Sequence, residues 1–157
     1  MAKPYGDEKG VISVESGYSG GDEENPSYDD VKKQRTGHRE TVKIEFDGEK
    51  TSFFELLQVY FYNIDPFDDG GQFIDRGHSY TCAVYYVSEE QKEIAEKAIS
   101  DIEKKYGKKV FVAVEKFKSF YKAEEYHQNF AKKNPEAYDT EYISSGRKDK
   151  TEFIKLN

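Results

Sequence analysis

The sequence has no tryptophan and only one cysteine, Cys82, among its 157 residues. A single thiol excludes an internal disulfide framework and a cysteine-rich zinc site, so a reducing cytoplasm is the expected location. The chain also lacks any run approaching the roughly 18 consecutive apolar residues that a membrane span needs. Its first seven residues contain no apolar run of the kind found in secretory signals. These absences predict a cytoplasmic protein with no membrane partner.

An excess of positive charge is also missing, because the formal net charge is -7 at pH 7. Such a chain repels a phosphate backbone overall, which argues against nucleic acid as a partner. Charged residues make up 35% of the chain, but 13 tyrosines and 11 phenylalanines are more aromatic residues than disordered chains carry. The length suits one domain with a sizeable core. We expect one folded domain over residues 1–157, with a polar tail over residues 137–157.

Four segments have the composition of β-strands. Residues 41–46 are the clearest, because Val42, Ile44 and Phe46 alternate strictly and Asp47-Gly48 follows them. The other expected strands are residues 10–21, which end in a glycine-rich turn, residues 80–87 and residues 108–114.

Three segments are typical of helices. Thr51 or Ser52 can cap the first, whose apolar residues recur at helical spacing until Asp65-Pro66 stops it. A capping box at residues 88–91 opens the second, and residues 123–133 predict a short third helix. The resulting order of strand, strand, helix, strand, helix, strand predicts an α+β fold, a two-layer sandwich of sheet and helices.

Several loop motifs could carry chemistry, but each also has a plain structural interpretation. The glycine-rich residues 17–21 could hold a phosphate, yet no helix follows them, which favours a turn. His38 and Glu40 match the His-x-Glu of zinc deaminases, but the partner Cys-x-x-Cys is absent. Glu40 is either an exposed carboxylate at a strand end or a general acid with a pKa raised by burial. Tyr28 and Tyr80 are either packing aromatics or donors to a ligand oxygen.

Taken together, the motifs are more specific. They occur in the order Gly17-Tyr18-Ser19-Gly20-Gly21, Asn25-Pro26-Ser27-Tyr28, Thr36-Gly37-His38-Arg39-Glu40, Gln72-Phe73-Ile74-Asp75-Arg76-Gly77 and Glu125-Tyr126-His127-Gln128. In content and order they resemble the A-type peptide methionine sulfoxide reductases, and the resemblance extends from residue 10 to residue 147.

The resemblance implies a ferredoxin-like core with long functional loops and an activity in protein repair under oxidative stress. In that family a cysteine thiolate attacks the sulfur of methionine (S)-sulfoxide, free or in proteins, while a Glu and two Tyr bind and protonate the oxygen. A second cysteine usually resolves the resulting sulfenic acid, and thioredoxin or another thiol is the external reductant. No bound cofactor or metal is implied. By position, Glu40 corresponds to the acid, Tyr28 and Tyr80 to the oxygen-binding phenols, and Asp75 to a supporting residue.

The chain departs from the family at the nucleophile. Family members carry a first strand followed by Gly-Cys-Phe-Trp, which supplies the thiol and the pocket for the substrate methyl group. Here residues 1–5 resemble the stretch after that motif, so we expect the first strand, the nucleophile and the methyl pocket to be missing from the N-terminus. Cys82 lies two residues beyond Tyr80, on the same face if both belong to a strand. Family members have a small Ser or Thr there, and we expect Cys82 to be a buried structural residue rather than a substitute nucleophile.

Three interpretations follow. In the first, the natural protein is a reductase and this chain is an N-terminally shortened version of it. In the second, the chain is a sulfoxide-binding module without catalysis. In the third, it is an α+β interaction domain whose motifs are relics. Upstream coding sequence favours the first interpretation, and sulfoxide binding without turnover favours the second. A chain that folds but does neither leaves the third.

The N-terminal departure leads to a prediction at the level of the gene. Some family members use selenocysteine, encoded by UGA, as the nucleophile, and a reading frame interrupted there would restart at the next Met. We expect an in-frame UGA followed by Phe and Trp codons immediately upstream of the Met1 codon, with ordinary truncation and a true pseudoenzyme as the alternatives. Sequencing that DNA is the test, and unrelated or out-of-frame sequence excludes the selenocysteine explanation.

Overall fold

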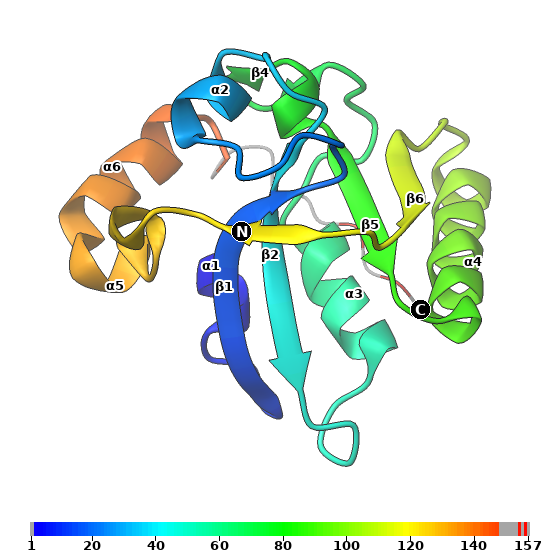
Figure 1. Cartoon of the computed structure of the whole chain (residues 1–157). Helices are drawn as coiled ribbons and strands as arrows, with labels where there is room; N and C mark the ends of the chain where they lie inside the picture. Colours follow the sequence, from blue (N-terminus) through cyan, green and yellow to red (C-terminus); the bar gives the residue numbers. More distant parts are fainter. Residues whose placement is uncertain (1, 148–153, 155, 157) are drawn as a thin grey trace.

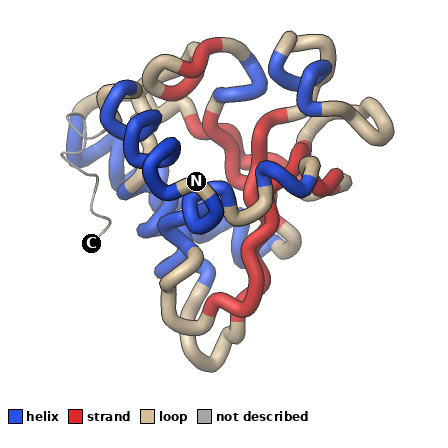
Figure 2. The backbone as a smooth tube through the Cα atoms, turned by 90° about the vertical axis from the view of Figure 1, so that its left-hand side faces the viewer, coloured by secondary structure: helices blue, strands red, loops and turns tan. Residues whose placement is uncertain are grey.

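A computed structural model describes residues 2–147, 154 and 156 of the chain. The strands run through the centre of the molecule (Figures 1 and 2), and in the view of Figure 1 helices lie on both sides of them. In chain order they are α1 (Ala2–Tyr5), β1 (Val11–Ser19), α2 (Tyr28–Lys32), β2 (Arg39–Phe46), α3 (Phe53–Tyr62), β3 (Gly71–Gln72), β4 (Asp75–Arg76), η1 (His78–Tyr80), β5 (Cys82–Tyr86), α4 (Glu89–Tyr106), β6 (Val112–Lys116), β7 (Phe120–Lys122), η2 (Glu125–His127), α5 (Phe130–Lys133) and α6 (Pro135–Ser144).

The largest sheet has the order β2-β1-β7, with all pairs antiparallel. β1 pairs with β2 from Val11 opposite Phe46 to Ser19 opposite Arg39, and with β7 from Gly17 to Ser19. A side chain at Gly17 would collide with the Phe120 ring and the Tyr121 carbonyl, 2.4 Å from an added Cβ. Glycine at this position therefore lets β7 approach β1.

A second, parallel pair is formed by β5 and β6, which α4 connects. The main core lies between this pair and helices α3 and α4. Its buried members are Leu57, Phe61, Cys82, Val84, Ala95, Ala98, Ile102, Val110, Val112 and Ile154. This cluster joins two patterns seen in the sequence. Apolar residues at helical spacing come from α3 and α4, and alternating residues come from β5.

Side-chain caps fix where the two long helices begin. Ser52 and Glu55 form a capping box, in which the Ser52 hydroxyl accepts from the Glu55 N–H at 3.2 Å and the Glu55 carboxylate accepts from the Ser52 N–H at 2.8 Å. Such caps contribute about 1 kcal/mol each. At α4, Ser88 accepts from the Gln91 N–H, but the Gln91 side chain accepts from the Val87 N–H. The capping box expected at residues 88–91 therefore forms only in part, because the Gln91 side chain accepts from the N–H of Val87 and not from that of Ser88.

The α+β class and the order of the main strands and helices are confirmed. Two local predictions were wrong. Tyr80 ends the 3₁₀ turn η1 and only Cys82 begins the strand, so the two do not share a strand face. Residues 123–133 are not one helix, because Asn129 takes a left-handed conformation (φ 54°) between η2 and α5. Pro135 begins α6 at a position where Pro suits the first helical turn.

The polar tail expected over residues 137–157 is partly helical. Part of the polar tail, residues 137–144, belongs to α6, while residues 148–153, 155 and 157 lie outside the described residues. Within the described part of the chain, no helix combines the length and the apolar character that crossing a membrane requires.

Candidate active site

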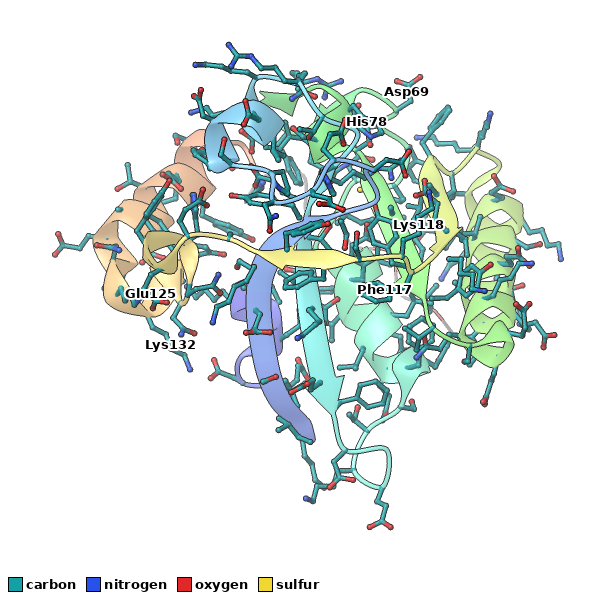
Figure 3. All side chains as sticks on the ribbon, viewed as in Figure 1. Asp69, His78, Phe117, Lys118, Glu125 and Lys132 are labelled. Atoms are coloured by element: carbon teal, nitrogen blue, oxygen red, sulfur yellow. The ribbon has the colours of Figure 1, made fainter. Side chains whose placement is uncertain are left out.

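A cavity of about 620 Å³ lies between β2 and β5, and all four residues assigned to the site from the sequence line it: Tyr28, Glu40, Asp75 and Tyr80. They come from different elements, namely α2, β2, β4 and η1. Segments far apart in the sequence therefore converge on one space. Figure 3 labels His78, which begins the turn η1 that carries Tyr80.

Glu40 is the second residue of β2 and pairs with Tyr18 of β1, whereas the sequence placed it just before the strand. The residue is partly accessible because it borders the cavity, while protein groups surround the carboxyl on its other sides. Burial among the surrounding protein groups raises the pKa of Glu40, and the nearby Asp75 carboxylate raises it further. A hydrogen bond from Tyr80 opposes these effects without cancelling them. The arrangement thus favours the protonated carboxylic acid more than water does.

Tyr28 begins α2, where the Ser27 hydroxyl caps the helix by accepting from the Asp30 N–H at 3.2 Å. The Tyr28 N–H donates to one carboxylate oxygen of Glu124 at 2.9 Å, and the Tyr18 hydroxyl donates to the other at 2.8 Å. Burial alone would raise the pKa of Glu124, but these hydrogen bonds lower it. Glu124 is therefore a charged anchor that fixes the Tyr28 backbone against β1.

Tyr80 is held by a contact with the loop that follows α2. The Gln34 side chain donates to the Ser79 hydroxyl at 2.7 Å and accepts from the Ser79 N–H at 3.0 Å. Gln34 itself has a left-handed backbone, φ 58°. Burial raises the pKa of Tyr80, and the negative charge of Glu40 raises it further. Tyr80 consequently stays a neutral phenol, able to donate its proton to a ligand oxygen.

Asp75 belongs to the short β3–β4 hairpin, where Gln72 lies opposite it. Arg147, just beyond α6, approaches the Asp75 carboxylate at 3.4 Å and stacks over the Phe73 ring. Asp75 lines the cavity together with Glu40, and its negative charge raises the pKa of Glu40. Asp75 therefore acts on Glu40 through its charge.

His38 has a structural role. Its ring is fully buried, its Nδ1 accepts from the Gly21 N–H at 3.2 Å, and its Nε2 donates to the Glu23 carbonyl at 2.8 Å. Both ring nitrogens are thus used in holding the glycine-rich turn. Among the residues that the structure describes, no group of three or more His, Cys, Asp or Glu is placed to bind a metal ion.

Two residues of the motif at 125–128 have defined roles: Gln128 forms hydrogen bonds with β1, and His127 borders the cavity. The Gln128 side chain accepts from the Ser16 N–H at 3.0 Å and donates to the Ser16 carbonyl at 2.8 Å, so it extends the hydrogen bonding of β1. The His127 ring lies 4.4 Å from the Tyr28 ring and borders the cavity. Its Nε2 is buried and has no hydrogen-bond partner in the described structure. Burial lowers the pKa of His127, which therefore favours the neutral ring.

Cys82 also lines this cavity, on the side that the main hydrophobic core forms. It is 5% exposed, belongs to the main hydrophobic cluster and hydrogen bonds with Tyr60. Burial raises the pKa of the Cys82 thiol to about 11, with the Tyr60 hydrogen bond acting in the opposite direction. Reactive cysteines instead have low pKa values and partial exposure. Cys82 has the environment of a structural residue.

Sequence reasoning missed the residues that position the site, above all Gln34, Glu124 and Arg39. The Arg39 side chain donates to the Thr81 hydroxyl and to the Tyr85 hydroxyl, both at 2.9 Å, and pairs with Glu115 at 3.0 Å. Arg39 and Glu124 lie within or beside the quoted motifs, but nothing in one sequence separates an anchor from a surface charge. Gln34 carries no local signal at all.

The chain is similar to known proteins over most of its length. A family model described as peptide methionine sulfoxide reductase matches residues 1–155. A protein of Bacillus velezensis named peptide methionine sulfoxide reductase MsrA is 44% identical over 149 residues, which cover 94% of this chain and 84% of that protein. MsrA 2 of Staphylococcus aureus strain Mu50 is 45% identical over 150 residues, covering 94% and 85%.

Two solved structures are also similar. The reduced form of Mxr1 from Saccharomyces cerevisiae superposes with a TM-score of 0.76 at 28% identity, covering 81% of this chain and 74% of that chain. Methionine sulfoxide reductase A of Corynebacterium diphtheriae gives a TM-score of 0.77 at 25% identity, with coverages of 85% and 69%. The α+β fold is thus shared with both.

Proposed function

Since the chain belongs to the peptide methionine sulfoxide reductase family of oxidoreductases, we propose that its cavity binds methionine (S)-sulfoxide, free or in proteins, and supports its reduction to methionine. The observation that carries this proposal is the convergence of Tyr28, Glu40 and Tyr80 on one cavity. A sulfoxide oxygen accepts hydrogen bonds and is a poor leaving group until it is protonated. It therefore needs neutral donors and an acid in one place.

The three side chains meet this need in different ways. Tyr80 has a raised pKa and remains a neutral donor, and Tyr28 offers a second phenol from α2. Glu40, with its raised pKa, supplies the proton, and Asp75 assists by favouring the protonated form of Glu40. The proposed order of events is hydrogen bonding of the oxygen by the phenols, followed by protonation from Glu40 as a thiolate attacks the sulfur.

The redox step balances with one thiol for each sulfoxide. The thiol sulfur is oxidised by two electrons and receives the oxygen as a sulfenic acid, while the sulfoxide sulfur is reduced by two electrons and leaves as methionine. Two external thiol groups, from thioredoxin or small thiols, then return the sulfenic acid to a thiol and form a disulfide and water. No metal or bound cofactor takes part in this scheme.

We do not assign the attacking thiol to Cys82, whose burial and raised pKa oppose thiolate formation. We place it instead on the Gly-Cys-Phe-Trp motif that the resemblance expects ahead of residue 1. The alternative function is a module that binds methionine sulfoxide without reducing it. The observation that favours this alternative is the same buried Cys82, which leaves the oxygen-binding residues without an accessible thiol on this chain.

A chain carrying an added N-terminal strand that ends in Gly-Cys-Phe-Trp, here called the strand-extended chain, tests the proposal. With dithiothreitol it should reduce the S diastereomer of a methionine sulfoxide peptide and leave the R diastereomer unchanged, as measured by chromatography of the products. Equal reduction of both diastereomers contradicts the proposed site. Binding of the S diastereomer by calorimetry, with no turnover by the strand-extended chain, selects the binding module.

The raised pKa of Glu40 predicts how the reaction depends on pH. We expect kcat/KM of the strand-extended chain to fall as pH rises through the pKa of Glu40, because only the protonated carboxyl can donate to the oxygen. Asp75→Asn removes a charge that raises this pKa, so the fall should move to lower pH. Asp29→Asn on the exposed side of α2 is the control and should leave the midpoint unchanged. An unchanged midpoint in Asp75→Asn contradicts the assignment.

A further inference from the structure

Arg147 brings a guanidinium to the cavity from just beyond α6. Gly146, with a φ of 72°, turns the chain after the helix, and the Ser145 hydroxyl accepts from the Arg147 N–H at 3.4 Å. The same hydroxyl donates to the Tyr142 carbonyl at 2.9 Å, which ties this turn to the end of α6. The backbone of Arg147 is thus held in place, while its side chain remains 32% exposed.

The guanidinium of Arg147 lies on an aromatic ring. Its Cζ atom is 5.1 Å from the centre of the Phe73 ring, a distance at which an arginine is attracted to an aromatic face. Phe73 lies in the turn of the β3–β4 hairpin and has a left-handed backbone, φ 57°. This conformation costs free energy in a residue with a side chain, and such strain is concentrated at binding sites. Phe73 therefore serves as a platform for the Arg147 side chain.

Most hydrogen-bond donors of Arg147 are unused. Its Nη2 approaches an Asp75 carboxylate oxygen at 3.4 Å, which is longer than the roughly 2.7–2.9 Å of a strong charge-assisted hydrogen bond. A guanidinium carries five N–H donors. Among the residues that the structure describes, none accepts a hydrogen bond from Nε or Nη1 of Arg147. The positive charge of Arg147 is thus only partly offset by Asp75.

A second cation lies near the oxygen-binding groups. The Lys32 Nζ is 5.4 Å from the centre of the Tyr28 ring, and the charge of Lys32 lowers the pKa of Glu40. Lys32 is exposed and lies outside the set of described residues that line the cavity. It helps to attract an anion to this part of a chain whose net charge is -7. Arg147 is the cation placed to contact an anion inside the cavity.

The main chain of methionine sulfoxide determines which ligand meets Arg147. Only two methylene groups separate its sulfur from Cα, so a ligand whose sulfoxide oxygen is bound by Glu40 and Tyr80 keeps its main chain in the same cavity. Asp75 lies between the two regions, because it acts on Glu40 through its charge and contacts Arg147 directly. A free amino acid or a C-terminal residue presents a carboxylate there, whereas an internal residue presents uncharged amides. A carboxylate pairs with the guanidinium, but an amide covers it without supplying a charged acceptor.

We propose that Arg147 binds the main-chain carboxylate of the ligand, so that the cavity prefers methionine (S)-sulfoxide with a free carboxylate, either as the free amino acid or as a C-terminal residue. This inference rests on the proposed function for the sulfoxide end of the ligand, whereas the carboxylate contact is a separate property of Arg147. Phe73 and Asp75 are positioning residues that hold the guanidinium. The two sources of the carboxylate differ in the amino group, which is charged only in the free amino acid.

Isothermal titration calorimetry with the intact chain tests this proposal through binding alone. The ligands are N-acetyl-L-methionine (S)-sulfoxide, called the acid, its N-methylamide, and free L-methionine (S)-sulfoxide. We expect the acid to bind at least about tenfold more tightly than the N-methylamide, because hydrogen bonds to charged groups are the stronger ones. Tighter binding of the free amino acid than of the acid identifies the free amino acid as the ligand. The reverse order identifies a C-terminal residue.

Variants assign the preference to one side chain. Arg147→Gln should bring the affinity ratio of acid to N-methylamide close to one. Arg147→Lys retains the charge without the planar fork and should give an intermediate ratio. Arg35→Gln is the matched control, because Arg35 is exposed and pairs with Asp29 and Asp30, and the ratio should stay at its wild-type value. A cooperative thermal transition in each variant shows that it is folded.

Equal binding of the acid and the N-methylamide overturns the proposal, and so does an absence of binding by all three ligands. A preference that persists in Arg147→Gln and disappears in Lys32→Gln also overturns it, because the carboxylate then pairs with Lys32. The proposed function fails in a different way. A preference for the acid that does not distinguish the S from the R diastereomer contradicts the oxygen-binding site and leaves the carboxylate contact of Arg147 standing.

Discussion

Replacing Glu40 by glutamine in the strand-extended chain is expected to lower kcat/KM for methionine (S)-sulfoxide by at least about 100-fold, the usual contribution of a general acid. Glutamine retains the size and the hydrogen-bonding shape of the side chain but has no carboxyl proton to give. The raised pKa of Glu40 makes that proton available in the wild-type cavity. Steady-state reduction of the S diastereomer across a range of pH measures the effect.

The matched control is Glu49→Gln, an exposed glutamate in the turn between β2 and α3. It makes the same chemical replacement far from the oxygen-binding groups and should leave kcat/KM unchanged. In Glu40→Gln the fall of the rate at high pH should also disappear, because the group that titrates has been removed. A rate within a factor of a few of the wild type, with the same pH profile, contradicts the role of Glu40.

The second large effect is an absence of turnover in the chain without an added strand. With dithiothreitol as reductant, it should form no methionine from either diastereomer, because the Cys82 thiol is buried beside Tyr60. With a pKa of about 11, only about one Cys82 in ten thousand is a thiolate at pH 7. Chromatography of the reaction products gives the answer.

Cys82→Ser separates the two explanations for any activity seen. If the chain reduces the sulfoxide and the variant does not, Cys82 is the nucleophile and our assignment is wrong. Alkylation by iodoacetamide is an independent measurement. Cys82 should react slowly in the folded chain and at the ordinary rate of a free thiol once the chain is unfolded in urea.

Local sequence patterns predicted much of the fold, because the spacing of apolar residues follows which face of a strand or helix is buried and the capping serines mark where a helix begins. Alternation at Val42, Ile44 and Phe46 and the capping serines Ser52 and Ser88 identified β2, α3 and α4. Predictions failed where the backbone conformation depends on contacts distant in sequence. Tyr80 lies in a 3₁₀ turn that Gln34 secures from 45 residues away, and Asn129 adopts positive φ within an otherwise helical pattern.

The site was predictable as a set of residues but not as a geometry. The motifs identified Tyr28, Glu40, Asp75 and Tyr80, and the structure places them around one cavity. The groups that hold them could not be predicted, because the Glu124 contact with Tyr28 joins residues 96 positions apart.

The central claim is that Tyr28, Glu40 and Tyr80 of this chain bind and protonate the sulfoxide oxygen, while the attacking thiol belongs to a Gly-Cys-Phe-Trp motif and not to Cys82. Locating the sulfenic acid after a single turnover tests it most directly. The strand-extended chain is mixed with the S diastereomer in the absence of reductant, trapped with dimedone and analysed by peptide mass spectrometry. We predict one adduct per methionine formed, on the cysteine of the added Gly-Cys-Phe-Trp motif. An adduct on Cys82 would contradict the account.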